Sequence, residues 1–199
     1  EQVVDDQQFM HVVPAALREI GVLVEPLTIA EKALIQVWDV QARLPWTASG
    51  HAGDGHGQRA VVLGAGPVGL LGALALGVRG FETWVYSREP ADGPTARWVA
   101  GVGAHYVSAQ GQALAQLAAQ VGNIDLIYEA PGASRLSFEA LALLGTNGVF
   151  VFTGVPGRKA PIAIDTDLLM RNLVLKNQLV FGTVNASAEA YDAAIADLA

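Results

Sequence analysis

The feature that most constrains the fold is a regular alternation of short apolar runs and longer helix-like segments, which begins at Arg59. The apolar runs lie at Ala60–Leu63, Thr83–Tyr86, His105–Val107, Ile124–Glu129, Val149–Thr153 and Leu179–Val184. Segments with helical spacing of apolar residues lie between them, at Val68–Val78, Thr95–Val102, Ala113–Val121, Arg135–Leu144 and Asp167–Leu175. Apolar strands that are separated by helices form a parallel sheet covered on both faces. We therefore predict an α/β fold with a doubly wound parallel sheet of six strands.

The region before Arg59 lacks this alternation. Phe9–Val13 is apolar enough for a strand, and Glu25–Val40 has the apolar spacing of a helix. Thr28–Glu31 reads TIAE and fits a capping box, in which the Glu31 carboxylate accepts from the Thr28 amide. Residues 47–58 are rich in glycine and polar residues, as in a linker. We expect three parts: the end of a preceding domain with a connecting helix (1–46), a linker (47–58) and the α/β domain (59–199).

Charge and composition exclude several classes of function. The formal charge of −7 argues against nucleic acid or an anionic membrane as the main partner. The chain has no cysteine, so it holds no disulfide, cysteine nucleophile or thiolate metal site. No apolar run is long enough to cross a bilayer, and no targeting motif is visible, so we expect a cytoplasmic protein. The chain begins without methionine and ends in a helix-like segment, which suggests a fragment of a longer protein.

A glycine motif, G-x-G-x-x-G, lies between the first strand and the first helix of the alternating region. It comprises Gly64, Ala65, Gly66, Pro67, Val68 and Gly69. In a βαβ unit, the first glycine allows a tight turn, the second lets backbone amides approach a pyrophosphate, and the third brings the helix close to the strand. The helix N-terminus adds unpaired N–H groups and the positive end of its dipole. The alternative is a glycine turn without a ligand, but this context favours a dinucleotide.

The end of the second strand predicts which dinucleotide binds. An acidic residue that binds the adenine ribose is expected there, but Ser87 stands at this position and is followed by Arg88. Serine removes a carboxylate that would repel a 2′-phosphate, and arginine offers a planar cationic group to bind it. Glu89 complicates this interpretation, because it could accept a hydrogen bond from a 2′-hydroxyl. We predict NADP as the preferred cofactor, with NAD tolerated; the alternative for Arg88 is a solvated surface side chain.

Two further strand ends are expected at the same edge of the sheet, because ligands of such folds bind beyond the carboxyl ends of the strands. These are Tyr128–Gly132 and Phe152–Gly157, whose small residues leave room for ribose and nicotinamide. Ordinary βα turns explain them equally well. The histidines do not predict a metal site: His51 and His56 fall in the linker, and His11 and His105 lie in strand-like runs.

Six stretches of the sequence together resemble the zinc-dependent glucose dehydrogenases of the medium-chain dehydrogenase/reductase superfamily. They are IGVLVEPLTIAEKAL, VVLGAGPVGLL, YSREP, IDLIYEAPG, NGVFVFTGVPG and VLKNQLVFGTVNAS, in the expected order over nearly the whole chain. The resemblance implies a Rossmann domain preceded by a short remnant of a GroES-like catalytic domain. Most zinc ligands and the catalytic residues would then lie outside this chain, which would bind nucleotide without turnover.

The resemblance also assigns cofactor contacts. It places the phosphate loop at Ala65, Gly66, Pro67 and Val68, and the 2′-phosphate contacts at Ser87 and Arg88. Family members usually have asparagine or glycine and then two arginines there, whereas this chain has one arginine and then Glu89. The nicotinamide side falls on Thr153, Gly154, Val155, Thr183, Val184 and Asn185.

Two of the implied contacts involve the substrate. The asparagine that matches Asn185 lies near the sugar in the family, and the residue that matches Glu25 lies near the catalytic zinc and the sugar. From the sequence alone, Glu25 is better explained as an acid near a helix N-terminus, just before Pro26, where it stabilises the helix dipole. The resemblance favours the role in zinc and sugar binding.

The implied activity is oxidation of an aldose, most simply glucose to gluconolactone, with hydride transfer to NADP or NAD and with zinc in the full-length enzyme. A small sugar would be the partner, and the full-length protein would form a homo-oligomer, a dimer or tetramer. A polyol, alcohol or threonine dehydrogenase of the same superfamily is the first alternative. A non-catalytic nucleotide-sensing module is the second.

Overall fold

A computed structural model describes residues 4–42, 54–157 and 160–199. Within these ranges the chain forms a six-stranded sheet in the order β3-β2-β1-β4-β5-β6, with every neighbouring pair parallel. The strands are β1 (Arg59–Leu63), β2 (Glu82–Ser87), β3 (His105–Ser108), β4 (Leu126–Glu129), β5 (Val149–Phe152) and β6 (Leu179–Gly182). The order reverses direction at β1, where β4 pairs on the other side of the strand. This is the doubly wound sheet that the alternation of apolar runs predicts.

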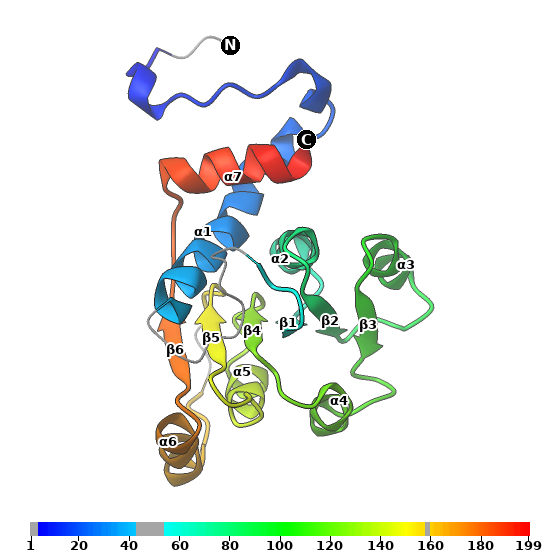
Figure 1. Cartoon of the computed structure of the whole chain (residues 1–199). Helices are drawn as coiled ribbons and strands as arrows, with labels where there is room; N and C mark the ends of the chain where they lie inside the picture. The colour runs from blue at the N-terminus through cyan, green and yellow to red at the C-terminus, as the bar shows by residue number, and fades with distance from the viewer. Residues whose placement is uncertain (1–3, 43–53, 158–159) are drawn as a thin grey trace.

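Helices cover both faces of the sheet, as Figure 1 shows. The helices are α1 (Val24–Gln41), α2 (Pro67–Val78), α3 (Pro94–Gly101), α4 (Leu114–Val121), α5 (Ser134–Leu141), α6 (Thr166–Leu175) and α7 (Ala188–Leu198). One core cluster joins α1, α2, α3 and α7 to one face of the sheet. A second cluster joins α4, α5 and α6 to the other face.

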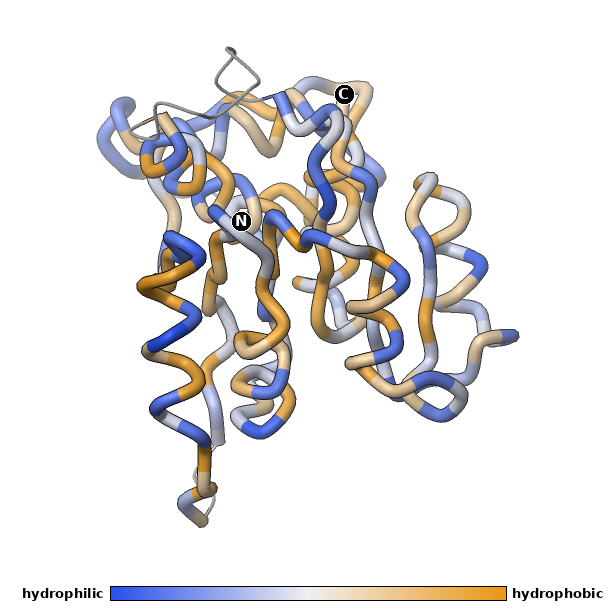
Figure 2. Tube along the Cα trace, turned by 60° about the horizontal axis from the view of Figure 1, so that its bottom comes forward, coloured by the Kyte–Doolittle hydropathy of each residue, from blue (hydrophilic) through white to orange (hydrophobic). Residues whose placement is uncertain are grey.

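The two clusters follow from the pleat of the strands, because successive side chains point to opposite faces. In β1, Val62 belongs to the first cluster, whereas Val61 and Leu63 belong to the second. All three side chains are essentially inaccessible. Hydrophobic residues accordingly concentrate in the central strands, whereas the outer helices alternate in hydropathy (Figure 2). This pattern explains why the strand runs are continuously apolar in the sequence.

Helix α2 packs unusually close to the sheet. A Cβ atom at Gly72 would lie 2.5 Å from the ring of Tyr128 on β4. A larger residue at that position would push the helix away from the strand. Tyr128 is itself buried, and this burial raises the pKa of its hydroxyl to about 12.

The predicted elements are present, with ends that differ by one to three residues. For example, α5 ends at Leu141 rather than at residue 144, and β6 ends at Gly182 rather than at residue 184. The helix predicted over residues 25–40 is α1. Of the predicted linker, residues 54–58 are described, and Gly55 packs against the ring of Phe81. The rest of the linker, including His51, lies outside the described residues.

The strand predicted at Phe9–Val13 is wrong. A single 3-10 turn, Gln7–Phe9, is followed by residues without regular structure up to Pro14. Among the described residues, no strand pairs with this segment. An apolar run without a neighbouring strand cannot satisfy its backbone hydrogen bonds as a sheet does.

The capping box predicted at Thr28–Glu31 is also wrong. Helix α1 begins at Val24, so both residues lie a full turn inside the helix. The hydroxyl group of Thr28 donates to the carbonyl oxygen of Glu25 at 2.5 Å. The Glu31 carboxylate points away from the helix axis to Arg79, at the end of α2. The partly buried Arg79 side chain therefore contacts the carboxylate that the sequence pattern assigned to the helix terminus.

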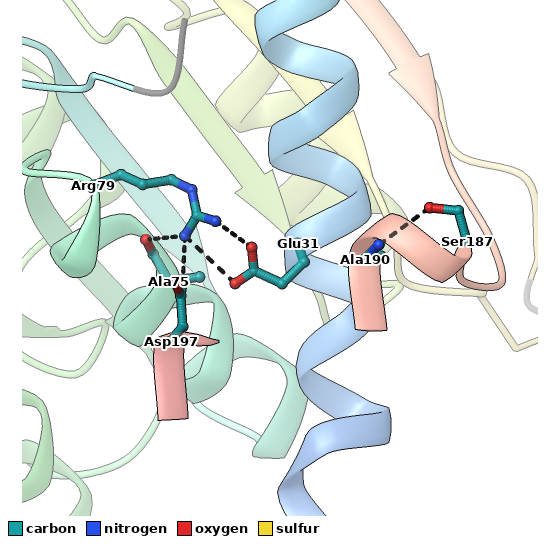
Figure 3. A network of polar contacts seen from close by, with 6 residues as sticks. All are labelled: Glu31, Ala75, Arg79, Ser187, Ala190 and Asp197. Carbon is teal, nitrogen blue, oxygen red and sulfur yellow. Dashed lines mark hydrogen bonds and ion pairs between the residues drawn. The ribbon is translucent and has the colours of Figure 1, made fainter. Parts of the chain in front are cut away.

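Arg79 connects three helices through this contact (Figure 3). Its guanidinium group also pairs with Asp197 on α7 and donates to the carbonyl oxygen of Ala75. Glu31 is fully buried, and Arg79 is 16% exposed. These contacts hold α1 and α7 against α2, the helix that follows the glycine motif.

No helix among the described residues is long and apolar enough to cross a membrane.

Candidate functional site

The carboxyl ends of the strands lie at one edge of the sheet, because all six strands run parallel. The residues predicted to contact a cofactor follow four of these ends, and the turn after β4 lies among them. Gly64–Gly69 follow β1, Ser87–Glu89 end β2 or follow it, and Thr153–Val155 follow β5. Thr183–Asn185 follow β6, and the turn after β4 lies between β1 and β5. The fold therefore brings together the residues that the sequence places more than 100 positions apart.

The glycine loop has the geometry that each glycine predicts. Gly64 has a φ of +86°, and its amide donates to the carbonyl oxygen of Tyr86 at 2.9 Å, which ties the loop to β2. A Cβ at Gly69 would lie 2.2 Å from the carbonyl oxygen of Gly64, so only glycine permits this approach of helix and strand. A Cβ at Gly66 would meet nothing within 4 Å. Gly66 therefore borders open space.

Gly66 is also the N-cap of α2, and no side chain caps the helix there. Pro67 is the first residue of the helix and has no N–H group. The amides of the following residues, Val68 and Gly69, have no acceptor within the helix, as is general for a first helical turn. The open space beside Gly66 is thus lined by backbone donors and by the positive end of the α2 dipole.

The end of β2 presents a free cation to the same edge. Arg88 is exposed, and its guanidinium group has no hydrogen-bond or ion-pair partner in the described parts of the chain. Glu89 is exposed as well and does not pair with Arg88. The backbone of these residues is held from the side of β3: Gln110 donates to the Arg88 carbonyl oxygen at 2.8 Å, and Tyr106 to that of Glu89 at 3.0 Å.

The turns after β4 and β5 touch through their backbones. A Cβ at Gly154 would lie 2.1 Å from the amide nitrogen of Gly132, and one at Gly132 would lie 2.7 Å from the carbonyl group of Val155. Both glycines are therefore needed for the close contact. Thr153 is fixed beside them, because its amide and its hydroxyl group both donate to the carbonyl oxygen of Glu129, each at 2.9 Å.

Glu129 is a site residue that the sequence reasoning missed. It ends β4, and its side chain is fully buried. One carboxylate oxygen accepts from the Ala133 amide at 3.3 Å and from the Ser137 hydroxyl group at 3.1 Å. The other oxygen accepts from the Gly154 amide at 3.3 Å. The signal in the sequence is an acidic residue that ends an otherwise apolar strand run.

The residues after β6 have no regular structure and bend at Asn185, which has a φ of +61°. The ammonium group of Lys32 on α1 donates to the carbonyl oxygen of Val184 at 2.5 Å, so α1 fixes this bend. The hydroxyl oxygen of Thr183 is buried and has no hydrogen-bond partner within the described residues. Val184 and Asn185 are exposed at the edge of the sheet.

Glu25 lies in the first turn of α1, two residues into the helix rather than before it. It is exposed. In the described ranges, no three or more His, Asp or Glu side chains form a group that could hold a metal ion. The remaining histidines have structural contacts: His11 stacks on Tyr191, His105 stacks on Trp84, and His56 contacts Asp54.

The comparison with known proteins agrees with this arrangement. Residues 18–199 match the family described as "Glucose dehydrogenase C-terminus". The chain belongs to this family. Its fold and its chain order are those of the nucleotide-binding region of the medium-chain glucose dehydrogenases.

Relatives of the glucose dehydrogenase family align over most or all of this chain. A glucose 1-dehydrogenase of Methanocella arvoryzae is 35% identical over 88% of this chain and 46% of its own length. That of Thermoproteus tenax is 35% identical over 100% of this chain and 53% of its own length. The chain thus spans about half the length of the curated relatives it matches.

A solved glucose dehydrogenase has the same fold. The enzyme of Haloferax mediterranei, in complex with NADP, Zn and gluconolactone, superposes with a TM-score of 0.84 and is 28% identical. The match covers 97% of this chain and 52% of that one. A 2R,3R-butanediol dehydrogenase of Bacillus subtilis shares the fold with a TM-score of 0.70 at 23% identity.

Proposed function

We propose that this chain is the cofactor-binding part of an NADP-preferring aldose dehydrogenase, which oxidises glucose to gluconolactone. The proposal is supported by membership of the glucose dehydrogenase family and by the open space beside Gly66. The named relatives are glucose 1-dehydrogenases, and the solved relative from Haloferax mediterranei was captured with NADP and gluconolactone. The chain spans about half the length of these proteins, and we propose that the catalytic residues lie in the other half.

The observation that carries the choice of NADP is the free guanidinium group of Arg88. The Gly64 amide bonds to β2 two residues before Arg88, so the glycine loop and Arg88 lie at neighbouring strand ends. A pyrophosphate on the α2 N-terminus would place the adenosine ribose over the end of β2. A 2′-phosphate there would find a planar cation that has no competing partner among the described residues and, at Ser87, no carboxylate to repel it.

The residues of the chain have distinct roles in this proposal. The backbone amides from Gly66 onward bind the pyrophosphate, and Ser87 and Arg88 bind the 2′-phosphate. Thr153, Gly154 and Val155, with Thr183, Val184 and Asn185, hold the nicotinamide ring in a fixed orientation. The bound nicotinamide supplies the hydride acceptor. Glu89 is free to accept from a 2′-hydroxyl, which allows NAD to bind more weakly.

Zinc does not fit the described residues alone. A zinc site needs three or four ligands, and Glu25 is a single exposed carboxylate with no acidic or histidine cluster around it in the described parts. We propose Glu25 as one contact to zinc and sugar in the full-length enzyme, and Asn185 as a second contact to the sugar. Homo-oligomerisation of that enzyme stays a prediction, which light scattering tests.

The test of this function compares the two cofactors. We expect the protein to bind NADP more tightly than NAD, and Arg88→Ala to raise the NADP dissociation constant about tenfold or more while changing that of NAD little. Arg171→Ala is the matched control, because Arg171 is an exposed arginine on α6. Isothermal titration measures the affinity of each of the three proteins for each cofactor. Equal affinity for NADP and NAD in the unchanged protein would refute the preference.

A further inference from the structure

We infer that Glu129 is the residue that positions the nicotinamide-binding part of the site. The inference rests on the proposed function, and it concerns a residue that makes no contact with the cofactor itself. Glu129 is buried between two turns, and both turns border the space assigned to the nicotinamide. It would act on the cofactor through Thr153 and Gly154.

Six donor–acceptor contacts converge on this one residue; the Gly154 N–H is shared between two of them, and the Ser137 hydroxyl group also lies 2.9 Å from the Ala133 carbonyl oxygen. Its carbonyl oxygen accepts from the amides of Thr153 and Gly154, at 2.9 and 3.2 Å, and from the Thr153 hydroxyl group at 2.9 Å. Its carboxylate accepts from Gly154 on one side and from Ala133 and Ser137 on the other. The backbone contacts would form with any residue at this position. The carboxylate contacts need an acceptor with two oxygens.

The carboxylate bridges two segments, and among the described residues no other side chain is hydrogen-bonded to both of them. Gly154 belongs to the turn after β5, whereas Ala133 and Ser137 belong to the start of α5. Each carboxylate oxygen serves one segment, so the distance between the segments is set by the carboxylate group. The positive end of the α5 dipole stabilises the negative charge in this buried place.

The backbone contact between the two turns makes their relative position critical. Gly154 and Gly132 approach so closely that neither tolerates a Cβ atom. A shift of the β5 turn therefore cannot be absorbed locally, and it moves Thr153 and Val155 with it. A small displacement at this point would misplace the nicotinamide, while the phosphate loop and Arg88 lie at other strand ends and keep their places.

The test separates the two halves of the cofactor. NADPH reports binding at both halves, whereas adenosine 2′,5′-bisphosphate reports binding at the adenosine half only. In Glu129→Gln, an NH2 group replaces one of the two carboxylate oxygens. Its N–H groups then face the donors that this oxygen accepted from, which are either Gly154 or Ala133 and Ser137. We expect the dissociation constant of NADPH to rise about tenfold. That of adenosine 2′,5′-bisphosphate should change less than about twofold.

Asp125→Asn is the matched control. Asp125 precedes β4 at the opposite edge of the sheet, and its carboxylate accepts from the Arg59 amide at 2.8 Å and from the Asn123 side chain at 2.7 Å. Asp125→Asn also replaces a carboxylate that joins two segments, but Asp125 lies at the opposite edge of the sheet from the proposed nicotinamide site. We expect lower stability in urea and an unchanged ratio of the two affinities.

A second variant, Ser137→Ala, keeps the charge of Glu129 and removes one donor. It should raise the dissociation constant of NADPH about threefold relative to that of adenosine 2′,5′-bisphosphate. This variant keeps the inference testable if Glu129→Gln does not fold. Loss of affinity for both ligands by the same factor, or for neither, would overturn the positioning role. If the unchanged protein binds neither ligand, the proposed function fails instead.

Discussion

At the residue scale, Gly66 and Gly69 show that two glycines of one motif serve different purposes. Both belong to the G-x-G-x-x-G sequence, which does not distinguish them. A Cβ at Gly69 would collide with the backbone of Gly64, whereas a Cβ at Gly66 would enter open space. Gly69 is therefore required by the fold, whereas the fold does not require glycine at position 66.

These two positions give a paired prediction. Gly66→Ala should leave the free energy of unfolding within about 0.5 kcal/mol, because its extended backbone suits any residue, but should lower the NADP affinity at least tenfold. Gly69→Ala should cost about 3 kcal/mol, because helix and strand must separate. Urea unfolding and titration with NADP measure both variants. Normal NADP binding by Gly66→Ala would remove the loop from the binding site.

Glu129 shows the limit of reasoning from single residues. The sequence singles out the small residues that follow this strand, because they leave room for a ligand. The acidic residue before them attracts attention only when three donors from two distant segments surround its carboxylate. Ser137 and Gly154 are 17 positions apart in the printed sequence, and no local pattern relates them.

At the element scale, α1 shows how tertiary contacts override a local pattern. Thr28 and Glu31 have the spacing of a capping box, but the helix begins a turn earlier, at Val24. Its first turn is stabilised by packing, since Val24 and Leu27 are buried in the core. Glu31 is then carried to the buried face, where Arg79 supplies a partner that the sequence of α1 cannot predict.

The contacts between α1, α2 and α7 predict how stability depends on pH. Burial, with a smaller contribution from Asp197, raises the pKa of Glu31 from 4.5 to about 8, against the opposing effect of Arg79. Between pH 4.5 and about pH 8, Glu31 is protonated in the folded protein and ionised in the unfolded chain. The contribution of Glu31 to stability is therefore full below pH 4.5 and is lost as the pH rises toward 8.

We expect the free energy of unfolding to fall from pH 5 to pH 8 more steeply in the unchanged protein than in Glu31→Gln, which cannot ionise. Urea unfolding at several pH values measures the difference between the two proteins. Groups that titrate equally in both proteins, such as Asp125, do not contribute to this difference in the free energy of unfolding. Parallel pH profiles would contradict the raised pKa of Glu31.

At the scale of the whole molecule, the strand order brings the site together. The crossover at β1 places β2 on one side and β4 on the other, so the glycine loop lies between Arg88 and the turns after β4 and β5. A dinucleotide laid across this edge would contact several elements at once. Its binding would stabilise the folded state as a unit.

Ligand-induced stabilisation tests this prediction. NADP at about 100 times its dissociation constant should add about 2.7 kcal/mol to the free energy of unfolding, because only the folded chain forms the site. At the same concentration NAD should add less. Thermal unfolding with each cofactor measures both effects, and Arg88→Ala should bring the two melting temperatures together. A larger shift with NAD would contradict the assignment of Arg88.

The parallel sheet, the succession of strands and helices, the glycine loop and the strand end that carries Arg88 can all be predicted from the amino-acid sequence. These features follow from local rules: the period of apolar residues, the conformational freedom of glycine, and the short distance along the chain from strand to turn. The partners of the Glu31 and Glu129 carboxylates, and the irregular backbone at Phe9–Val13, are visible only in the three-dimensional arrangement. A buried carboxylate takes its partners from whichever segments the fold brings beside it, and a strand needs a neighbour; both depend on contacts between residues that are remote in the sequence.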